Sequence, residues 1–116
     1  MKKLLLLTVV AAGIYACKSS KDTQLPPPAV EVELTPLEKG QKLYPGYTSA
    51  DYATGKELYG KKCSTCHDLP KVSHESVEGW KKTVPSMVAL SNKEGMPITA
   101  SEEDLITKYL VATRTK

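Results

Sequence analysis

The stretch KELYGKKCSTCHDLPK, residues 56–71, contains two of the three cysteines of the chain and the first of its two histidines. Tyr59, Cys63 and Cys66 are spaced i, i+4 and i+7, so on a helix they lie along one side, with His67 next to Cys66. The sequence therefore brings two thiols, an imidazole and an aromatic ring to one side of a single helical segment.

A Cys-x-x-Cys-His run is typical of covalent haem attachment. The two cysteines can form thioethers with both vinyl groups of one haem, and the adjacent histidine can then bind the iron from the proximal side. We therefore predict one covalent haem c, bound by Cys63, Cys66 and His67. The predicted domain is small, and the chain has no phenylalanine, so its side chains alone form only a marginal hydrophobic core. A haem would supply a large apolar surface around which the helices could pack.

Three other interpretations use the same atoms. A thioredoxin-like redox pair requires a strand before the cysteines and a surrounding α/β sheet, and the sequence indicates neither. A zinc site could use Cys63, Cys66 and His74, but the second close pair of ligands that is typical of structural zinc is missing. A plain disulfide, or two buried thiols, suits an exported protein but leaves His67 without a role.

The N-terminus predicts export. Residues 1–17, MKKLLLLTVVAAGIYAC, run from a basic start through an apolar stretch to small residues and Cys17, which is the layout of a secretory signal. The end of this segment, Ile14-Tyr15-Ala16-Cys17, resembles the lipobox of bacterial lipoproteins, in which the cysteine is acylated and becomes the first mature residue. The resemblance implies a lipoprotein signal peptide at residues 1–16 and lipidation of Cys17. The alternative is a plain signal peptide that leaves Cys17 as a free thiol.

Acyl chains on Cys17 would attach the protein to a membrane of the cell envelope. An aspartate directly after the acylated cysteine would resemble an inner-membrane retention signal, and this chain has Lys18 at that position. We therefore expect a lipid anchor in the outer membrane facing the periplasm, or at the cell surface.

Residues 17–47 include three consecutive prolines and show no helical stripe, which favours an extended, lipid-anchored Pro-rich tether. Within this segment GQKLY, residues 40–44, echoes GKELY, residues 55–59, and we interpret the echo as chance or as a short packing helix. Residues 48–116 are then expected to form one haem domain. Loss of residues 1–16 removes two lysines and lowers the formal net charge from +3 to +1, which argues against nucleic acid as a partner.

Three helices are expected in residues 48–116, which predicts an all-α fold. The first opens at a capping box formed by Thr54 and Glu57 and runs into the cysteines. The second covers Ser76 to about Leu90, and a kink or a new helical turn is expected at Pro85.

The third helix is capped by Thr99 or Ser101 and has acidic residues in its first turn. Its apolar stripe consists of Leu105, Ile106, Tyr109 and Leu110.

Residues 52–113 resemble the monohaem class I c-type cytochromes. Gly55, Tyr59 and Cys63, each four apart, look like the small residue, the aromatic ring and the first haem cysteine of that family's N-terminal helix. Ile106 and Tyr109 look like the apolar and aromatic pair with which its C-terminal helix crosses the first. The resemblance implies a small class I cytochrome c-like fold, with three or more short helices around one covalent haem.

Two methionines are candidates for the sixth iron ligand. Trp80 and Met87, followed by Gly95-x-Pro97, are similar to a subgroup of small bacterial cytochromes in which the methionine after the tryptophan binds the iron. Met96, which precedes Pro97, resembles the Met-Pro ligand of many other class I members. We expect Met87 to be the ligand, with Met96 as the alternative and His74 as a third candidate.

With a histidine and a methionine on the iron, no coordination site is open to a substrate, and the iron can only exchange electrons. We therefore expect a single-electron carrier that serves redox partner proteins and is not an independent enzyme. The alternatives are a haem-based sensor or small-ligand binder with an open sixth position, an electron-accepting subunit of a larger redox enzyme, and a haem-free thiol oxidoreductase. Five lysines near the motif could steer an acidic partner or simply be solvated: Lys61, Lys62, Lys71, Lys81 and Lys82.

Overall fold

The computed structural model describes residues 33–116. In this part of the chain there is no strand, and the predicted all-α class is confirmed. The predicted signal peptide, Cys17 and the prolines of the tether lie outside the described residues. The helices are α1 (Pro36–Leu43), α2 (Ser49–Lys62), the 3₁₀ helices η1 (Cys63–Thr65) and η2 (Val72–His74), α3 (Val77–Lys93) and α4 (Ala100–Arg114).

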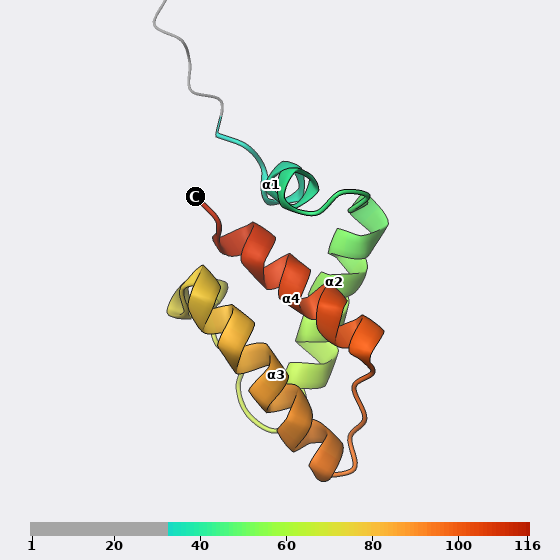
Figure 1. The fold of residues 1–116 in the computed structure, drawn as a ribbon. Helices are drawn as coiled ribbons and strands as arrows, with labels where there is room; N and C mark the ends of the chain where they lie inside the picture. Colours follow the sequence, from blue (N-terminus) through green and yellow to red (C-terminus); the bar gives the residue numbers. More distant parts are fainter. Residues whose placement is uncertain (1–32) are drawn as a thin grey trace, which may run out of the picture. The chain divides into compact units, whose positions relative to one another are not determined.

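Helix α4 is the element against which the other α-helices pack. It crosses α2, runs beside α3, and is covered near its C-terminal end by α1 (Figure 1). Ile106 and Leu110 of α4 are completely buried. The core around them contains Tyr59, Trp80, Val84, Val88, Ile98 and Tyr109. Of the four stripe residues predicted for this helix, Ile106, Tyr109 and Leu110 are therefore in the core, and Leu105 is half-buried.

The crossing of α2 and α4 depends on a glycine. A β-carbon on Gly55 would overlap the backbone carbonyl oxygen of Leu105 and lie 2.8 Å from the β-carbon of Tyr109. Since real β-carbons do not approach other atoms so closely, only glycine permits this separation of the two helices. The crossing fixes the position of Tyr59 and Cys63, one and two turns further along α2.

Helix α2 begins earlier than predicted. The side chain of Thr48 accepts a hydrogen bond from the Asp51 amide (3.1 Å), and the Asp51 carboxylate accepts one from the Thr48 amide (2.8 Å). This capping box satisfies the amides of Thr48 and Asp51 at the start of the helix. The predicted start at Thr54 is therefore wrong, and Thr54 lies inside the helix.

The folded part of the chain also begins earlier than the predicted boundary at residue 48. Thr35 and Glu38 form a capping box at the start of α1, and Pro36 occupies its first turn. Helix α1 then packs against α4, with Gly40 next to Tyr47 and Ala112. Residues 36–47 thus belong to the domain, and the echo at residues 40–44 is part of a short packing helix.

The last two helices follow the prediction more closely. Ser76 caps α3 by accepting a hydrogen bond from the Gly79 amide (2.9 Å), and Thr99 forms a capping box with Glu102 at α4. Helix α3 continues through Pro85 to Lys93, so no new helix begins at the proline. Pro85 has no amide hydrogen, so the carbonyl of Lys81 has no hydrogen-bond donor within the helix. Both residues are exposed, and water can therefore bind this carbonyl.

Candidate functional site

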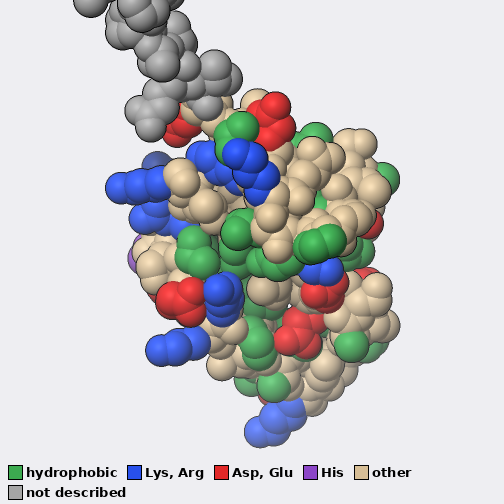
Figure 2. Space-filling model, turned by 45° about the horizontal axis from the view of Figure 1, so that its top comes forward, with side chains coloured by type: hydrophobic (Ala, Val, Ile, Leu, Met, Phe, Trp, Pro, Cys, Tyr) green, Lys and Arg blue, Asp and Glu red, His purple; other side chains and the backbone are tan. Residues whose placement is uncertain are grey.

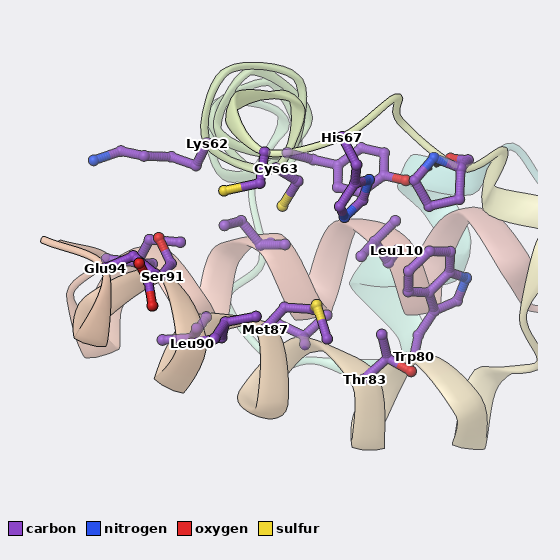
Figure 3. A pocket seen from close by; sticks show the side chains of 17 residues that line it. Lys62, Cys63, His67, Trp80, Thr83, Met87, Leu90, Ser91, Glu94 and Leu110 are labelled. Atoms are coloured by element: carbon purple, nitrogen blue, oxygen red, sulfur yellow. Dashed lines mark hydrogen bonds between the residues drawn. The ribbon is translucent and has the colours of Figure 1, made fainter. Parts of the chain in front are cut away.

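An apolar cavity of about 350 Å³ lies between the C-terminal end of α2, the inner side of α3 and the middle of α4. It is lined by Ile106 and Leu110 of α4 and by Val84 and Val88 of α3. Figure 3 shows Leu110 among the side chains around it. A cavity of this size and composition is typical of sites that bind a ligand through its apolar surface, with a few polar atoms to orient it.

Both motif cysteines line this cavity. Cys63 ends α2, where its amide donates to the Tyr59 carbonyl, and Cys66 follows one 3₁₀ turn later. The two thiols are free, and Cys63 is half-buried whereas Cys66 is exposed. Burial raises the pKa of the Cys63 thiol, so this thiol remains protonated at neutral pH. That environment is the opposite of the one that activates a redox-active thiolate.

His67 also lines the cavity, and its ring points into it (Figure 3). The ring atom Nδ1 lies 2.7 Å from the carbonyl oxygen of Asp68. This contact favours the tautomer that carries its proton on Nδ1, which leaves the lone pair of Nε2 available for a metal ion. The ring thus points into the cavity with Nε2 free to bind a metal ion.

Two side chains fasten the loop that follows His67. The hydroxyl of Tyr59 donates to the carbonyl of Pro70 (2.5 Å), and the indole Nε1 of Trp80 donates to the carbonyl of Val72 (2.8 Å). Both rings also form part of the cavity wall. The sequence indicates Tyr59 through its spacing from the cysteines and the family resemblance, and Trp80 through the resemblance alone. No sequence signal indicates that the backbone carbonyls of Pro70 and Val72 are their partners.

The structure separates the two candidate methionines. Met87 on α3 lines the cavity and faces His67 from the other side (Figure 3). Met96 does not line the cavity. Its backbone is held beside Ser91, because the Met96 amide donates to the Ser91 carbonyl (3.0 Å) and its carbonyl accepts from the Ser91 hydroxyl (2.6 Å). His74 in η2 is exposed and is not a cavity residue either.

The donor set fits a haem. An imidazole and a thioether facing each other across an apolar gap are the axial ligands of an electron-transfer haem, and two thiols at the edge of the gap match its two vinyl groups. The alternatives fit less well. Between residues 33 and 116 no three His, Cys, Asp or Glu side chains are placed to bind a metal ion, which leaves the zinc site of Cys63, Cys66 and His74 without support. The strand that a thioredoxin-like site needs does not precede the cysteines, because α2 does.

The lysines near the motif do not form an uninterrupted basic surface. Three of the five pair with carboxylates, and these pairs are Lys61 with Glu57 (2.5 Å), Lys62 with Glu102 (3.5 Å) and Lys81 with Glu78 (2.9 Å). Figure 2 shows acidic side chains among the basic ones on one face of the domain. Exposed pairs of this kind contribute little to stability, but they reduce the local positive potential.

No helix in the described part of the chain is long and apolar enough to span a membrane. No family model, curated protein or solved structure matches the chain. The interpretation of the site therefore depends on its residues and their geometry.

Proposed function

We propose that this protein is a single-electron carrier that holds one covalent haem c in the cavity between α2, α3 and α4. The observation that supports the proposal is the arrangement of four side chains around one apolar cavity: Cys63, Cys66 and His67 on one side and Met87 on the other. When bound, the haem supplies an iron that alternates between its ferrous and ferric states.

Each of these side chains has a distinct task. Cys63 and Cys66 retain the cofactor through thioether bonds, and His67 presents Nε2 to the iron while Asp68 holds the proton on Nδ1. Met87 provides a thioether sulfur, which favours the ferrous form and raises the reduction potential relative to a second histidine. With His67 and Met87 both holding the iron, the site would exchange electrons with redox partner proteins and would leave no place for a substrate.

The lipid anchor is part of the same proposal. Acylation at Cys17 would attach the domain to the outer membrane facing the periplasm, or to the cell surface, through the Pro-rich segment between Cys17 and α1. In that location the carrier exchanges electrons with exported partners. It could also serve as the electron-accepting subunit of a larger redox enzyme.

The test is expression of the full chain with its export signal in a host that carries a c-type haem maturation system. We expect a band at the size of the chain that stains for haem after denaturation, together with sharp absorption of the reduced protein. A double variant, Cys63→Ala with Cys66→Ala, should lose the stain. A colourless wild-type protein would disprove the proposal and leave the two cysteines as a thiol or metal site.

A second candidate function is a haem-based sensor or binder of small gases. One observation favours it: Met87 is 42% exposed, so a small gas could reach this side of the cavity from the solvent. Carbon monoxide separates the two functions. Binding of carbon monoxide to the reduced protein at neutral pH supports the sensor, and resistance to it supports the electron carrier.

A further inference from the structure

Four aromatic rings form an unbroken series through the domain. The ring centroids of Trp80 and Tyr59 are 6.0 Å apart, those of Tyr59 and Tyr109 are 6.1 Å apart, and those of Tyr109 and Tyr52 are 5.3 Å apart. Trp80 lies on α3, Tyr59 on α2 and Tyr109 on α4, and Tyr52 lies on an earlier turn of α2. All three steps are within the range of direct ring contact.

The two ends of the series lie in different surroundings. Trp80 and Tyr59 are buried and form part of the cavity wall, and Tyr109 is buried between the helices. Tyr52 is only half-buried and does not line the cavity. The series therefore connects the cavity with the protein surface near the start of α2.

Hydrogen bonds to backbone carbonyls account for the polar atoms of Tyr59 and Trp80. Packing alone does not explain the hydroxyl groups of Tyr109 and Tyr52, because a ring that only fills the core needs no hydroxyl and burial of a phenol costs free energy that burial of a phenyl group does not. Yet the chain has no phenylalanine, and all of its aromatic residues are six tyrosines and one tryptophan. Indole and phenol lose one electron far more readily than phenyl does.

We propose that Trp80, Tyr59, Tyr109 and Tyr52 carry single oxidising equivalents from the cavity to the protein surface. The oxidant is a small one-electron oxidant that diffuses into the cavity, such as nitrogen dioxide, which is reduced to nitrite by one electron taken from Trp80. An electron from Tyr52 then refills the indole by way of Tyr109 and Tyr59. Tyr52 releases its phenolic proton to water and becomes a neutral radical, which an external one-electron reductant can repair.

The buried rings transmit the charge without retaining it. A phenol is oxidised to a stable neutral radical only if its proton has somewhere to go. The Tyr59 hydroxyl donates to the Pro70 carbonyl, which is too weak a base to accept the proton. Burial raises the pKa of Tyr59 to about 12 and also raises the pKa of Tyr109. Among the four, the half-buried Tyr52 is the ring from which water can take the proton.

The test uses selective photoionisation of Trp80 in the purified full chain. Trp80 is the only tryptophan, so light absorbed by indole but not by phenol produces one radical at a known position, and nitrous oxide removes the ejected electron. We expect the indole radical to decay as a phenoxyl radical grows, and a spin trap followed by mass spectrometry should locate that radical on Tyr52. The hydroxyl radical that nitrous oxide forms from the ejected electron is removed by excess tert-butanol, so that it does not oxidise tyrosines directly. Since the light acts on Trp80 itself, the result does not depend on bound haem, whose presence is read separately from the absorption spectrum.

Three conservative variants make the test specific. Tyr52→Phe should remove most of the trapped radical, and Tyr109→Phe should prolong the indole radical, because phenylalanine preserves the packing but cannot be oxidised. Tyr44→Phe is the control, since Tyr44 pairs with Tyr47 (6.0 Å) outside the series. Unchanged indole decay and unchanged phenoxyl yield in both Tyr52→Phe and Tyr109→Phe would overturn the proposal, as would equal losses in Tyr44→Phe.

Discussion

His67 and Met87 face each other across one apolar cavity, although twenty residues and a long loop separate them in the sequence. The histidine is held by the contact of its Nδ1 with the Asp68 carbonyl and by a loop that Tyr59 and Trp80 anchor. The methionine stands on a continuous helix. An iron bound between them would therefore have both ligands on elements whose positions are fixed by the fold.

This relationship predicts the outcome of two methionine substitutions in the haem-loaded protein. Met87→Ala should lower the reduction potential and allow the reduced iron to bind carbon monoxide, because the thioether that favours the ferrous form and fills the sixth position is lost. Met96→Ala is the control and should do neither, because Met96 does not line the cavity. Redox titration and absorption spectra under carbon monoxide measure both effects. If Met96→Ala had these effects and Met87→Ala did not, Met96 would be the iron ligand.

Two glycines in α2 provide a matched test of the crossing with α4. Gly55→Ala should destabilise the fold by about 1–3 kcal/mol, because the added methyl group overlaps the Leu105 carbonyl and forces the helices apart. Gly60→Ala, with no atom within 4 Å of the new β-carbon, should stabilise it by about 0.5–1 kcal/mol through helix propensity. Urea unfolding followed by circular dichroism gives both values. Equal effects of the two substitutions would contradict the close approach.

The start of α2 can be tested with two threonines. Thr48→Ala should reduce the free energy of unfolding by about 1 kcal/mol, because the Asp51 amide loses its acceptor. Thr54→Ala should change it by less than about 0.5 kcal/mol, since Thr54 is an exposed residue inside the helix and caps nothing. If Thr54→Ala reduced the free energy of unfolding more than Thr48→Ala does, the helix would begin at Thr54, as the sequence predicted.

These cases show which features are readable from the sequence. The Cys63-x-x-Cys66-His67 run defines its own geometry because all of its atoms lie within five consecutive residues. At α4 the local pattern leaves the cap open between Thr99-x-x-Glu102 and Ser101-x-x-Asp104, and the structure uses Thr99. At α2, likewise, Thr48-x-x-Asp51 and Thr54-x-x-Glu57 both satisfy the local pattern of a capping box, and the earlier one prevails since it adds helical turns that bring Tyr52 onto Tyr109.

Features that depend on contacts between distant segments could not be read in this way. Helix α1 is short, and its packing depends on Gly40 meeting Tyr47 and Ala112, a contact that no local pattern indicates. The choice between Met87 and Met96 has the same origin. Both precede the cap of α4 at Thr99, and only the structure shows that Met87 lines the cavity and Met96 does not.

The hydroxyl of Tyr47 is buried and finds no hydrogen-bond partner among residues 33–116. Burial raises the pKa of Tyr47 to about 12, whereas the unfolded chain has a tyrosine pKa near 10. Between these values the unfolded state has lost the proton and the folded state retains it. The stability that Tyr47 contributes is therefore complete below about pH 10 and is lost as the pH rises through this window.

Tyr47→Phe should consequently leave the stability at pH 7 unchanged or increase it by up to about 1 kcal/mol, because an unpaired buried hydroxyl is removed. It should also weaken the loss of stability between pH 10 and 12. Tyr59→Phe is the contrasting variant: the pKa of Tyr59 is also raised to about 12, but its hydroxyl donates to Pro70, so the substitution should destabilise the protein at pH 7. Urea unfolding at pH 7 and at pH 11 measures both. A loss at pH 7 in Tyr47→Phe as large as that in Tyr59→Phe would mean that the Tyr47 hydroxyl has a partner after all.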